Sequence, residues 1–131
     1  MIQKHKVLVV DVDGTLCPIK QDGQQYGDLP IDAAMRDRLS ALKRDGWRIL
    51  LFSSRGMRTH EGDLAALATH VYPVMVDWLD RNEVPYDELV LGKPWPGSDG
   101  FYVDDRAVRP REFVDLSLQQ LTELCDRDRR L

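Results

Sequence analysis

Residues 7–16 read VLVVDVDGTL, and the fold of the chain is decided by this stretch. Val7 to Val10 form an unbroken β-branched and leucine run that is too short for a helix and apolar on both faces, which predicts a strand buried inside a parallel sheet. The run stops abruptly at Asp11, and Gly14 lets the backbone leave the strand steeply. A buried strand that ends in acidic residues is therefore the first predicted element.

Three further apolar runs end in polar residues in the same way. Arg48 to Phe52 predicts the second buried strand, Leu89 to Leu91 the third, and the short run Phe101 to Val103 a fourth. The polar residues that follow them are Ser53, Ser54 and Arg55 after the second run, Lys93 after the third, and Asp104 and Asp105 after the fourth.

Amphipathic segments lie between the predicted strands. Apolar residues recur at helical spacing between Pro30 and Gly46, where Pro30 suits a first turn and Gly46 a stop. Further helices are predicted around Val74 to Arg81 and from about Pro110 to Asp126, and residues 126–131 are expected to fray. Strands that alternate with helices predict an α/β fold with a three-layer, doubly wound, Rossmann-like and mostly parallel sheet.

Length and composition narrow the class of protein. With 131 residues the chain suits a single domain over residues 1–131, and it has no apolar run of membrane-spanning length and no signal peptide, so a cytoplasmic location is expected. The net charge of −4 is spread along the sequence, which makes a nucleic-acid partner unlikely. Cys17 and Cys125 show neither disulfide nor zinc spacing.

The polar residues at the strand ends predict one site. In an open parallel sheet, residues just beyond the carboxyl ends of the strands share a crevice. Four carboxylates gathered there, with oxygen-only ligation, indicate a Mg²⁺ ion. Asp11 is positioned as a nucleophile toward a phosphoryl group, Asp13 as general acid and then base, and Ser53 and Lys93 as partners of phosphoryl oxygens. The four carboxylates are those of Asp11, Asp13, Asp104 and Asp105.

The ordered set Asp11-Val12-Asp13-Gly14-Thr15-Leu16, then Ser53, then Lys93, then Asp104-Asp105 resembles the haloacid dehalogenase (HAD) superfamily of phosphatases. The flanking residues 52–57 and 84–94 are similar to a small subgroup labelled capsule or polysaccharide biosynthesis phosphatases. The resemblance spans residues 7–105 and all four motifs of the superfamily.

The resemblance implies an aspartyl-phosphate intermediate on Asp11 and acid/base catalysis by Asp13, with Ser53 and Lys93 binding phosphate. It implies that Mg²⁺ is held by Asp11, the Asp13 carbonyl and the acids of the fourth motif. Of these acids we favour Asp104 as the direct ligand, with Asp105 acting directly or through water. The intervals after the first two motifs leave no room for a large cap domain, so the site is expected to be open.

The expected function is thus hydrolysis of a small phosphorylated metabolite such as a sugar phosphate. Ser54 and Arg55 are further candidates for substrate binding, and His60 and His70 are minor ones, since most such histidines are surface or packing residues. The alternatives are a non-catalytic phosphate- or metal-binding regulatory domain and a phosphatase of nucleic-acid ends. A receiver-type domain fits less well because its acceptor Asp would follow a middle strand, where this chain has Ser53. The oligomeric state stays open, with a homo-oligomer as one option.

Overall fold

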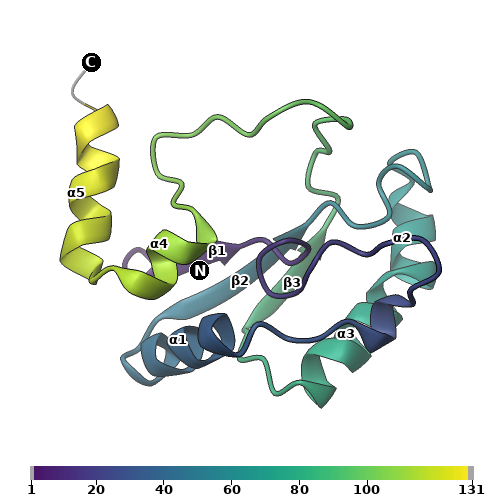
Figure 1. Cartoon of the computed structure of the whole chain (residues 1–131), viewed down its shortest axis with the longest axis horizontal. Helices are drawn as coiled ribbons and strands as arrows, with labels where there is room; N and C mark the ends of the chain where they lie inside the picture. The colour runs from purple at the N-terminus through teal and green to yellow at the C-terminus, as the bar shows by residue number, and fades with distance from the viewer. Residues whose placement is uncertain (1, 130–131) are drawn as a thin grey trace. The chain divides into compact units, whose positions relative to one another are not determined.

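The computed structural model of the protein describes residues 2–129, and the chain divides into two units between Trp95 and Pro96. The first unit contains a parallel sheet with its helices, and the second contains two helices and a long loop (Figure 1). The elements are β1 (Val7–Val10), η1 (Tyr26–Asp28), α1 (Ala33–Arg44), β2 (Arg48–Ser53), α2 (Leu64–His70), α3 (Tyr72–Arg81), β3 (Glu88–Leu91), α4 (Pro110–Asp115) and α5 (Leu118–Asp128).

The sheet of the first unit has the strand order β1-β2-β3, and both strand pairs are parallel. Val10 pairs with Leu51, and Ser53 pairs with Leu91, so the three strands end at one edge. Both crossovers advance in the same direction, and right-handed crossovers then place their helices on the same face of the sheet. Figure 1 shows α1 and α3 on the same side of the strands. Within the first unit, α1 and α3 therefore lie on the same face of the sheet, and the three carboxyl ends come together at one edge.

The core of the first unit lies between that face and the helices. Alternate residues of β2 point into it, and Ile49 and Leu51 are fully buried. Trp78 of α3 is also fully buried, and its indole Nε1 donates a hydrogen bond of 2.7 Å to the Leu29 carbonyl oxygen. This hydrogen bond links α3 to the loop that precedes α1. The other buried helix residues of this core are Met35, Leu39 and Leu42 of α1, Leu67 of α2, and Met75 and Leu79 of α3.

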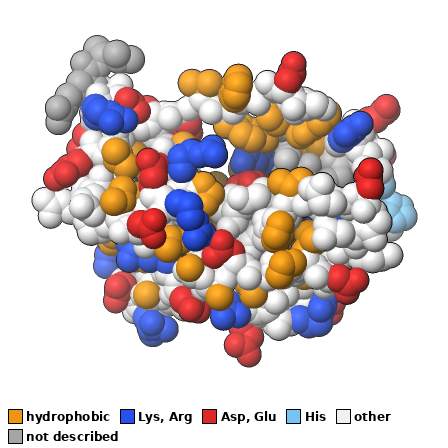
Figure 2. Space-filling view, viewed as in Figure 1, with side chains coloured by type: hydrophobic (Ala, Val, Ile, Leu, Met, Phe, Trp, Pro, Cys, Tyr) orange, Lys and Arg blue, Asp and Glu red, His pale blue; other side chains and the backbone are white. Residues whose placement is uncertain are grey.

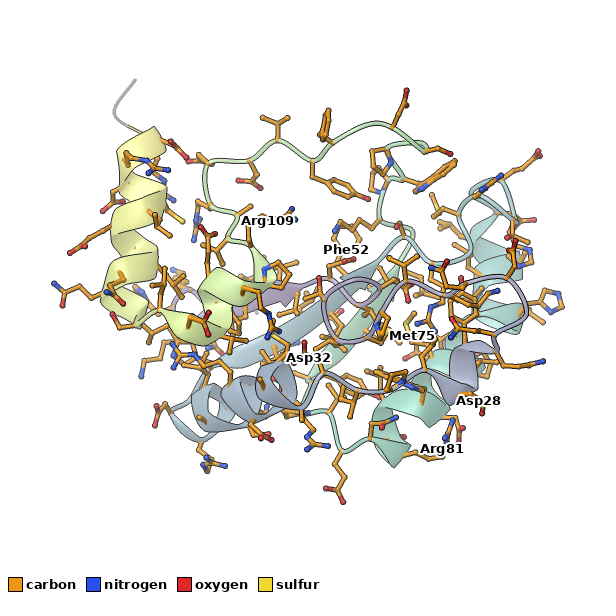
Figure 3. The ribbon with its side chains drawn as sticks, viewed as in Figure 1. Asp28, Asp32, Phe52, Met75, Arg81 and Arg109 are labelled. Carbon is orange, nitrogen blue, oxygen red and sulfur yellow. The ribbon has the colours of Figure 1, made fainter. Side chains whose placement is uncertain are left out.

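The first long helix begins later than the sequence pattern predicts. Asp32, rather than Pro30, sets its start, because the Asp32 carboxylate accepts a hydrogen bond of 3.0 Å from the Met35 backbone N–H (Figure 3). An N-cap must lie outside the helix, so Ala33 is the first helical residue. The predicted stop is confirmed, since Asp45 caps the helix and Gly46 takes a φ of +92°.

The first strand is less buried than its sequence predicts. β1 is an edge strand of the sheet formed by the described residues, and Val9 is 63% exposed. Its apolar run is buried on one face only, where Val10 contributes to the core. An unbroken apolar run does not distinguish an edge position from a central one, since both are compatible with the same composition.

Two elements lie in segments where no regular structure is expected from the sequence. α2 begins at Leu64, and its N-cap Asp63 has a carboxylate that accepts from the backbone N–H groups of Ala65 and Ala66. The short 3-10 helix η1 is held by α3, since Arg81 Nη2 donates to the Gly27 carbonyl oxygen at 3.0 Å, and Figure 3 shows Arg81 next to Asp28. Both elements are shorter than the window in which hydrophobic periodicity is recognised.

The second unit corrects two predictions. The fourth strand is absent from the described part of the chain: residues 101–103 form no ladder, and Phe101 and Val103 are 86% and 95% exposed. A three-residue apolar run is a weak indication of a strand. The predicted helix over 110–126 is two helices, because Ser117 caps a new one by accepting from the Gln120 backbone N–H.

The C-terminal segment that was expected to fray continues α5 as far as Asp128, while residues 130 and 131 lie outside the described residues. Phe113 of α4 and Leu121 of α5 are the buried side chains of these two helices.

The predicted α/β class is confirmed by a parallel sheet flanked by helices, and the topology is Rossmann-like. Between residues 2 and 129 no element is left over to form a large cap domain. No helix among these residues is long and apolar enough to span a membrane.

Candidate active site

The turn after β1 holds two acidic residues at the carboxyl edge of the sheet. Val12 and Leu16 are fully buried, and the backbone N–H groups of Thr15 and Leu16 both donate to the Val12 carbonyl oxygen. Gly14 adopts a φ of +82°, a conformation that favours glycine, as the tight turn requires. Asp11 and Asp13 flank the anchored Val12, so this turn fixes the position of both carboxylates.

Lys93, which follows β3, reaches the first of these carboxylates. Its Nζ lies 3.5 Å from Asp11 Oδ1, and the Thr15 hydroxyl donates to Asp11 Oδ2 at 3.3 Å. Burial raises the pKa of Asp11 above its ordinary value, and the nearby Lys93 ammonium opposes this shift. The Asp11 carboxylate is thus a partly desolvated anion with Lys93 as a cationic partner.

Ser53 ends β2 and organises the residues around it. Its side chain is 1% exposed, and its hydroxyl oxygen accepts a hydrogen bond of 3.0 Å from the Arg55 backbone N–H. Its carbonyl oxygen accepts from the Lys93 backbone N–H at 3.2 Å, which joins the ends of β2 and β3. Ser54 is half-buried in the turn that follows, and its carbonyl oxygen accepts from the Met57 backbone N–H.

Arg55 forms a bidentate ion pair with Asp13. Arg55 Nε donates to Asp13 Oδ2 at 3.0 Å, and Arg55 Nη2 donates to Asp13 Oδ1 at 2.8 Å. The Arg55 side chain is only 2% exposed, and its guanidinium carbon lies 4.1 Å from the centre of the Tyr26 ring. The pair orients the Asp13 carboxylate, and Tyr26 covers one face of the guanidinium.

The contact of Tyr26 with Arg55 was not predicted, because Tyr26 comes from a loop without periodicity. Thr15 belongs to the acidic motif, but a side-chain contact with Asp11 was not predicted. Cys17 lies beside the site, where its Sγ contacts Asp13 Oδ1 at 3.6 Å. Burial raises the pKa of Cys17 to about 12, so the thiol stays protonated and is a poor nucleophile.

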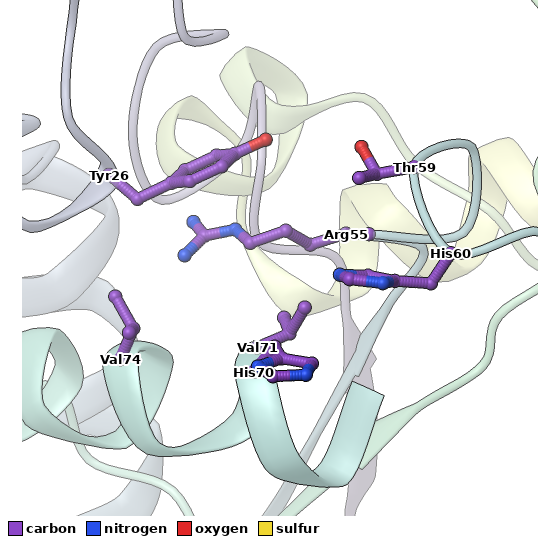
Figure 4. Close-up of a pocket in the computed structure, with 8 residues that line it drawn as sticks. Tyr26, Arg55, Thr59, His60, His70, Val71 and Val74 are labelled. Atoms are coloured by element: carbon purple, nitrogen blue, oxygen red, sulfur yellow. The ribbon is translucent and has the colours of Figure 1, made fainter. Parts of the chain in front are cut away.

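A pocket lies next to Arg55 (Figure 4). It has a volume of about 200 Å³. Two histidines form part of its wall, and the imidazole rings of His60 and His70 are stacked with their centres 5.6 Å apart. The full lining is Tyr26, Arg55, Gly56, Thr59, His60, His70, Val71 and Val74.

The two acids of the predicted fourth motif belong to the second unit. Asp104 Oδ1 accepts from the Arg106 backbone N–H at 2.8 Å, and Asp105 forms an ion pair of 2.9 Å with Arg129. The ion pair lowers the pKa of Asp105. Within residues 2–129 no three His, Cys, Asp or Glu side chains gather as a metal site. A role for these two acids in metal binding stays a prediction.

Charges of both signs are mixed over the face of the molecule in Figure 2, in keeping with the scattered charges of the sequence. Asp11 and Asp13 provide the oxygen donors of the first unit that suit a hard divalent cation. The raised pKa of Asp11 reflects a carboxylate that a further positive charge would stabilise. The donor chemistry of this edge therefore fits Mg²⁺.

Comparison with known proteins yields two solved structures. No family model matches the chain, and no curated protein matches it. The D,D-heptose 1.7-bisphosphate phosphatase from B. bronchiseptica, solved with magnesium and phosphate, has a TM-score of 0.49 and 15% identity over 72% of this chain and 54% of its own. A structural similarity of that degree supports no statement about the family or the function of this chain.

A target protein from Vibrio cholerae of known crystal structure is much more similar. It has 39% sequence identity and a TM-score of 0.89, and the match covers 95% of this chain and 99% of that protein. Identity of this extent over whole chains indicates common descent and a common fold. The chain belongs to the same family as the Vibrio cholerae protein.

Proposed function

We propose that the protein is a magnesium-dependent phosphomonoester hydrolase of the HAD superfamily that works through an aspartyl-phosphate on Asp11. The observation that carries the proposal is the arrangement at the carboxyl edge of the sheet. Asp11 after β1 pairs with Lys93 after β3, and Ser53 at the end of β2 is bonded to the Lys93 backbone. Residues from three strands thus supply a nucleophile, a hydroxyl and a cation.

In the first step, an Asp11 carboxylate oxygen attacks phosphorus in line with the leaving oxygen. The bond from phosphorus to the leaving oxygen breaks, and Asp13 donates a proton to that oxygen. Ser53 and Lys93 hold the phosphoryl oxygens, whose charge spreads during transfer. The products of this step are the free alcohol and phosphorylated Asp11.

In the second step, Asp13 acts as the base. It takes a proton from a water molecule, the water oxygen bonds to phosphorus, and the bond between phosphorus and Asp11 breaks. Inorganic phosphate leaves, and both carboxyl groups return to their starting states. Arg55 holds the ionised Asp13 carboxylate through two hydrogen bonds, so its part is to position Asp13 as the base of this step.

Mg²⁺ would be held by the Asp11 carboxylate and the Asp13 carbonyl oxygen, with Asp104 and Asp105 as the further acids. When bound, the ion supplies positive charge that offsets the repulsion between the phosphoryl oxygens and the attacking carboxylate. The substrate class is a small phosphorylated metabolite. The pairing of Asp11 with Lys93 supports this reading over a purely structural acidic turn, which would need no cation from another strand.

The test is hydrolysis of para-nitrophenyl phosphate and acetyl phosphate with Mg²⁺ and with EDTA. We expect metal-dependent turnover that Asp11→Asn abolishes and that Asp22→Asn, a change at an exposed loop position, leaves intact. Acid-quenched wild-type protein should carry radiolabelled phosphate that hydroxylamine removes, which indicates an acyl phosphate. Full activity in Asp11→Asn would refute the mechanism, and binding of phosphate without any turnover would favour a regulatory domain.

A further inference from the structure

Arg58 lies in the loop that follows β2 and has no part in the proposed reaction. Its residue is exposed, and among residues 2–129 its side chain forms no ion pair and no hydrogen bond. Glu61 is an acid of the same loop, yet it does not pair with Arg58. The Arg58 guanidinium carbon instead lies 5.9 Å from the centre of the Trp95 ring. Arg58 is thus directed at the segment after β3 rather than at a carboxylate.

The loop that contains Arg58 is held beside the phosphate-binding lysine at both of its ends. Ser53 precedes the loop, and its carbonyl oxygen accepts from the Lys93 backbone N–H at 3.2 Å. Leu64 follows the loop as the first residue of α2, and it packs on Gly92, where a Cβ would lie 2.9 Å from Leu64 Cδ2. The loop therefore runs alongside the segment that begins with Gly92 and Lys93.

Trp95 is joined to the reacting group by a short and stiff stretch of chain. Lys93 Nζ lies 3.5 Å from an oxygen of Asp11, the proposed nucleophile. Trp95 comes two residues after Lys93, so their Cα atoms are at most about 7 Å apart. Pro94 between them restricts the backbone. Trp95 is 41% exposed, which leaves part of its ring open to a ligand whose phosphoryl group lies at Asp11.

The charges around the reacting group are balanced without Arg58. Asp11 pairs with Lys93, and Asp13 pairs with Arg55. In the proposed reaction the transferred phosphoryl group brings negative charge of its own, which Mg²⁺ and Lys93 offset. The positive charge of Arg58 is then left over. A second anionic group on the substrate would balance it.

The contact with Trp95 leaves Arg58 able to bind an anion. A guanidinium that lies over an aromatic ring is held by the ring electrostatically and is not neutralised. Its N–H groups lie in the guanidinium plane, and their fork geometry matches the oxygens of a carboxylate or a phosphate. The indole adds a flat apolar surface for the carbon atoms that carry such a group.

We propose that Arg58 and Trp95 bind a second anionic group, a carboxylate or a phosphate, on the alcohol part of the substrate. The inference rests on the proposed phosphatase function and deepens it, because it restricts the substrates to phosphomonoesters that carry a further negative charge. Lys93 binds the phosphoryl group at one end of a short segment. Arg58, stacked on Trp95, binds the second anion at the other end.

Turnover is compared for pairs of esters that differ in the second charge. The first pair is para-carboxyphenyl phosphate and para-carbamoylphenyl phosphate, which have nearly the same shape, and the meta isomers form the second pair. A third pair, para-phenylene bisphosphate and phenyl phosphate, tests a phosphate in place of a carboxylate. The readout is the ratio of kcat/KM for the charged ester to that for the neutral one. Differences in leaving-group reactivity cancel when the ratio of a variant is divided by that of the wild type.

Arg58→Gln should lower this ratio roughly 5- to 10-fold for at least one pair, the effect of losing one charge-assisted contact at an exposed position. Arg44→Gln is the matched control, since it removes the same charge from an exposed position at the end of α1, and it should leave the ratio unchanged. Lys20→Gln is the second control. Lys20 also lacks a carboxylate partner among the described residues, but its Nζ lies over Tyr26, 5.5 Å from the ring centre.

Binding is tested without turnover on the full-length Asp11→Asn variant with Mg²⁺, by calorimetric titration of the same esters. We expect the charged ester of a pair to bind more tightly than the neutral one. Arg58→Gln and Trp95→Ala in this background should each reduce the difference, and added salt should reduce it as well. Both positions are exposed, so these variants are expected to fold.

Three results would overturn the inference. They are equal ratios in Arg58→Gln and Arg44→Gln, a fall in the ratio in Lys20→Gln but not in Arg58→Gln, and charged esters that bind no more tightly than their neutral partners. Failure of the proposed function gives a different result. In that case the charged esters bind in a way that depends on Arg58, but the wild-type protein hydrolyses no phosphomonoester, and the anion site stands without the phosphatase.

Discussion

Replacing Asp13 by alanine should destabilise the protein more than replacing its partner Arg55 by methionine. The two side chains of the pair are unequally buried, at 2% exposure for Arg55 and 21% for Asp13. Asp13→Ala leaves a guanidinium without water, without a counter-ion and without two charge-assisted hydrogen bonds. Arg55→Met keeps the volume of the side chain and leaves a carboxylate that still reaches solvent.

The magnitudes follow from this asymmetry. Breaking a buried ion pair by removing one partner costs about 3–5 kcal/mol, and the residual exposure of Asp13 places Asp13→Ala near 3 kcal/mol. We expect about 1–2 kcal/mol for Arg55→Met, since the remaining carboxylate is partly hydrated. For a chain of this size, 3 kcal/mol corresponds to a fall in Tm of roughly 10 °C. The exposed pair of Asp77 and Arg81 is the control, and Asp77→Ala should cost under ~0.5 kcal/mol.

The assay is urea unfolding of both single variants, the double variant and Asp77→Ala, all in EDTA so that no divalent ion contributes. The double-mutant cycle isolates the interaction of the pair. An Asp13→Ala variant that is as stable as Arg55→Met, or a coupling free energy no larger than the cost of Asp77→Ala, would refute the reasoning. Either result would mean that the guanidinium finds water or another partner once Asp13 is gone.

Three further predictions concern the packing and titration of the first unit. Gly56→Ala should lower the free energy of unfolding by about 2–4 kcal/mol, because the φ of Gly56 is +80° and a Cβ there would lie 2.6 Å from a Val71 methyl. Gly46→Ala is the control: its Cβ meets no atom within 4 Å, so this change should cost only the backbone strain of about 1–2 kcal/mol. Trp78→Phe should cost about 1–3 kcal/mol in the same measurement, since it leaves the buried Leu29 carbonyl oxygen without its donor; stability equal to wild type would show that water replaces the indole. The Lys43 ammonium, which hydrogen-bonds to Asp87, lowers the pKa of the Asp87 carboxyl. The stability that this pair contributes is therefore complete above the unfolded pKa of ~3.9 and is lost as the pH falls through the lower folded pKa. Asp87→Asn should remove part of the loss of stability below about pH 4 in acid titrations followed by circular dichroism, and an unchanged acid transition would contradict this.

Local patterns were sufficient to predict the sheet strands of the first unit and the acidic turn. The run Val7–Val10 and the following Asp11 to Gly14 encode a strand and a tight exit within a few residues, and the structure contains both. That Asp11 and Lys93 lie at the same edge of the sheet followed from the rule that parallel strands end at one edge, and the structure adds the ion pair between them. Both predictions depend on the types of residue and on the order of strands and helices along the chain, which can be read from the sequence.

The short elements and the second unit were predicted less well. α2 and η1 have too few residues to show a period, and the division of the predicted C-terminal helix depends on the cap that Ser117 supplies. The run 101–103 has strand composition but forms no ladder among the described residues. A strand needs a partner as well as a composition, and the partner is a property of the whole fold.

The sequence by itself determined the α/β class, the carboxyl-edge position of Asp11, Asp13, Ser53 and Lys93, and the type of chemistry that these residues suit. Only the tertiary structure decided that Arg55 holds Asp13, that Tyr26 stacks on this arginine and that a pocket opens beside them. The physical reason is the separation along the sequence over which each kind of interaction acts. Periodicity and turn chemistry act over a few neighbouring residues, whereas the Arg55 guanidinium meets its carboxylate and its aromatic ring only after distant segments have packed together.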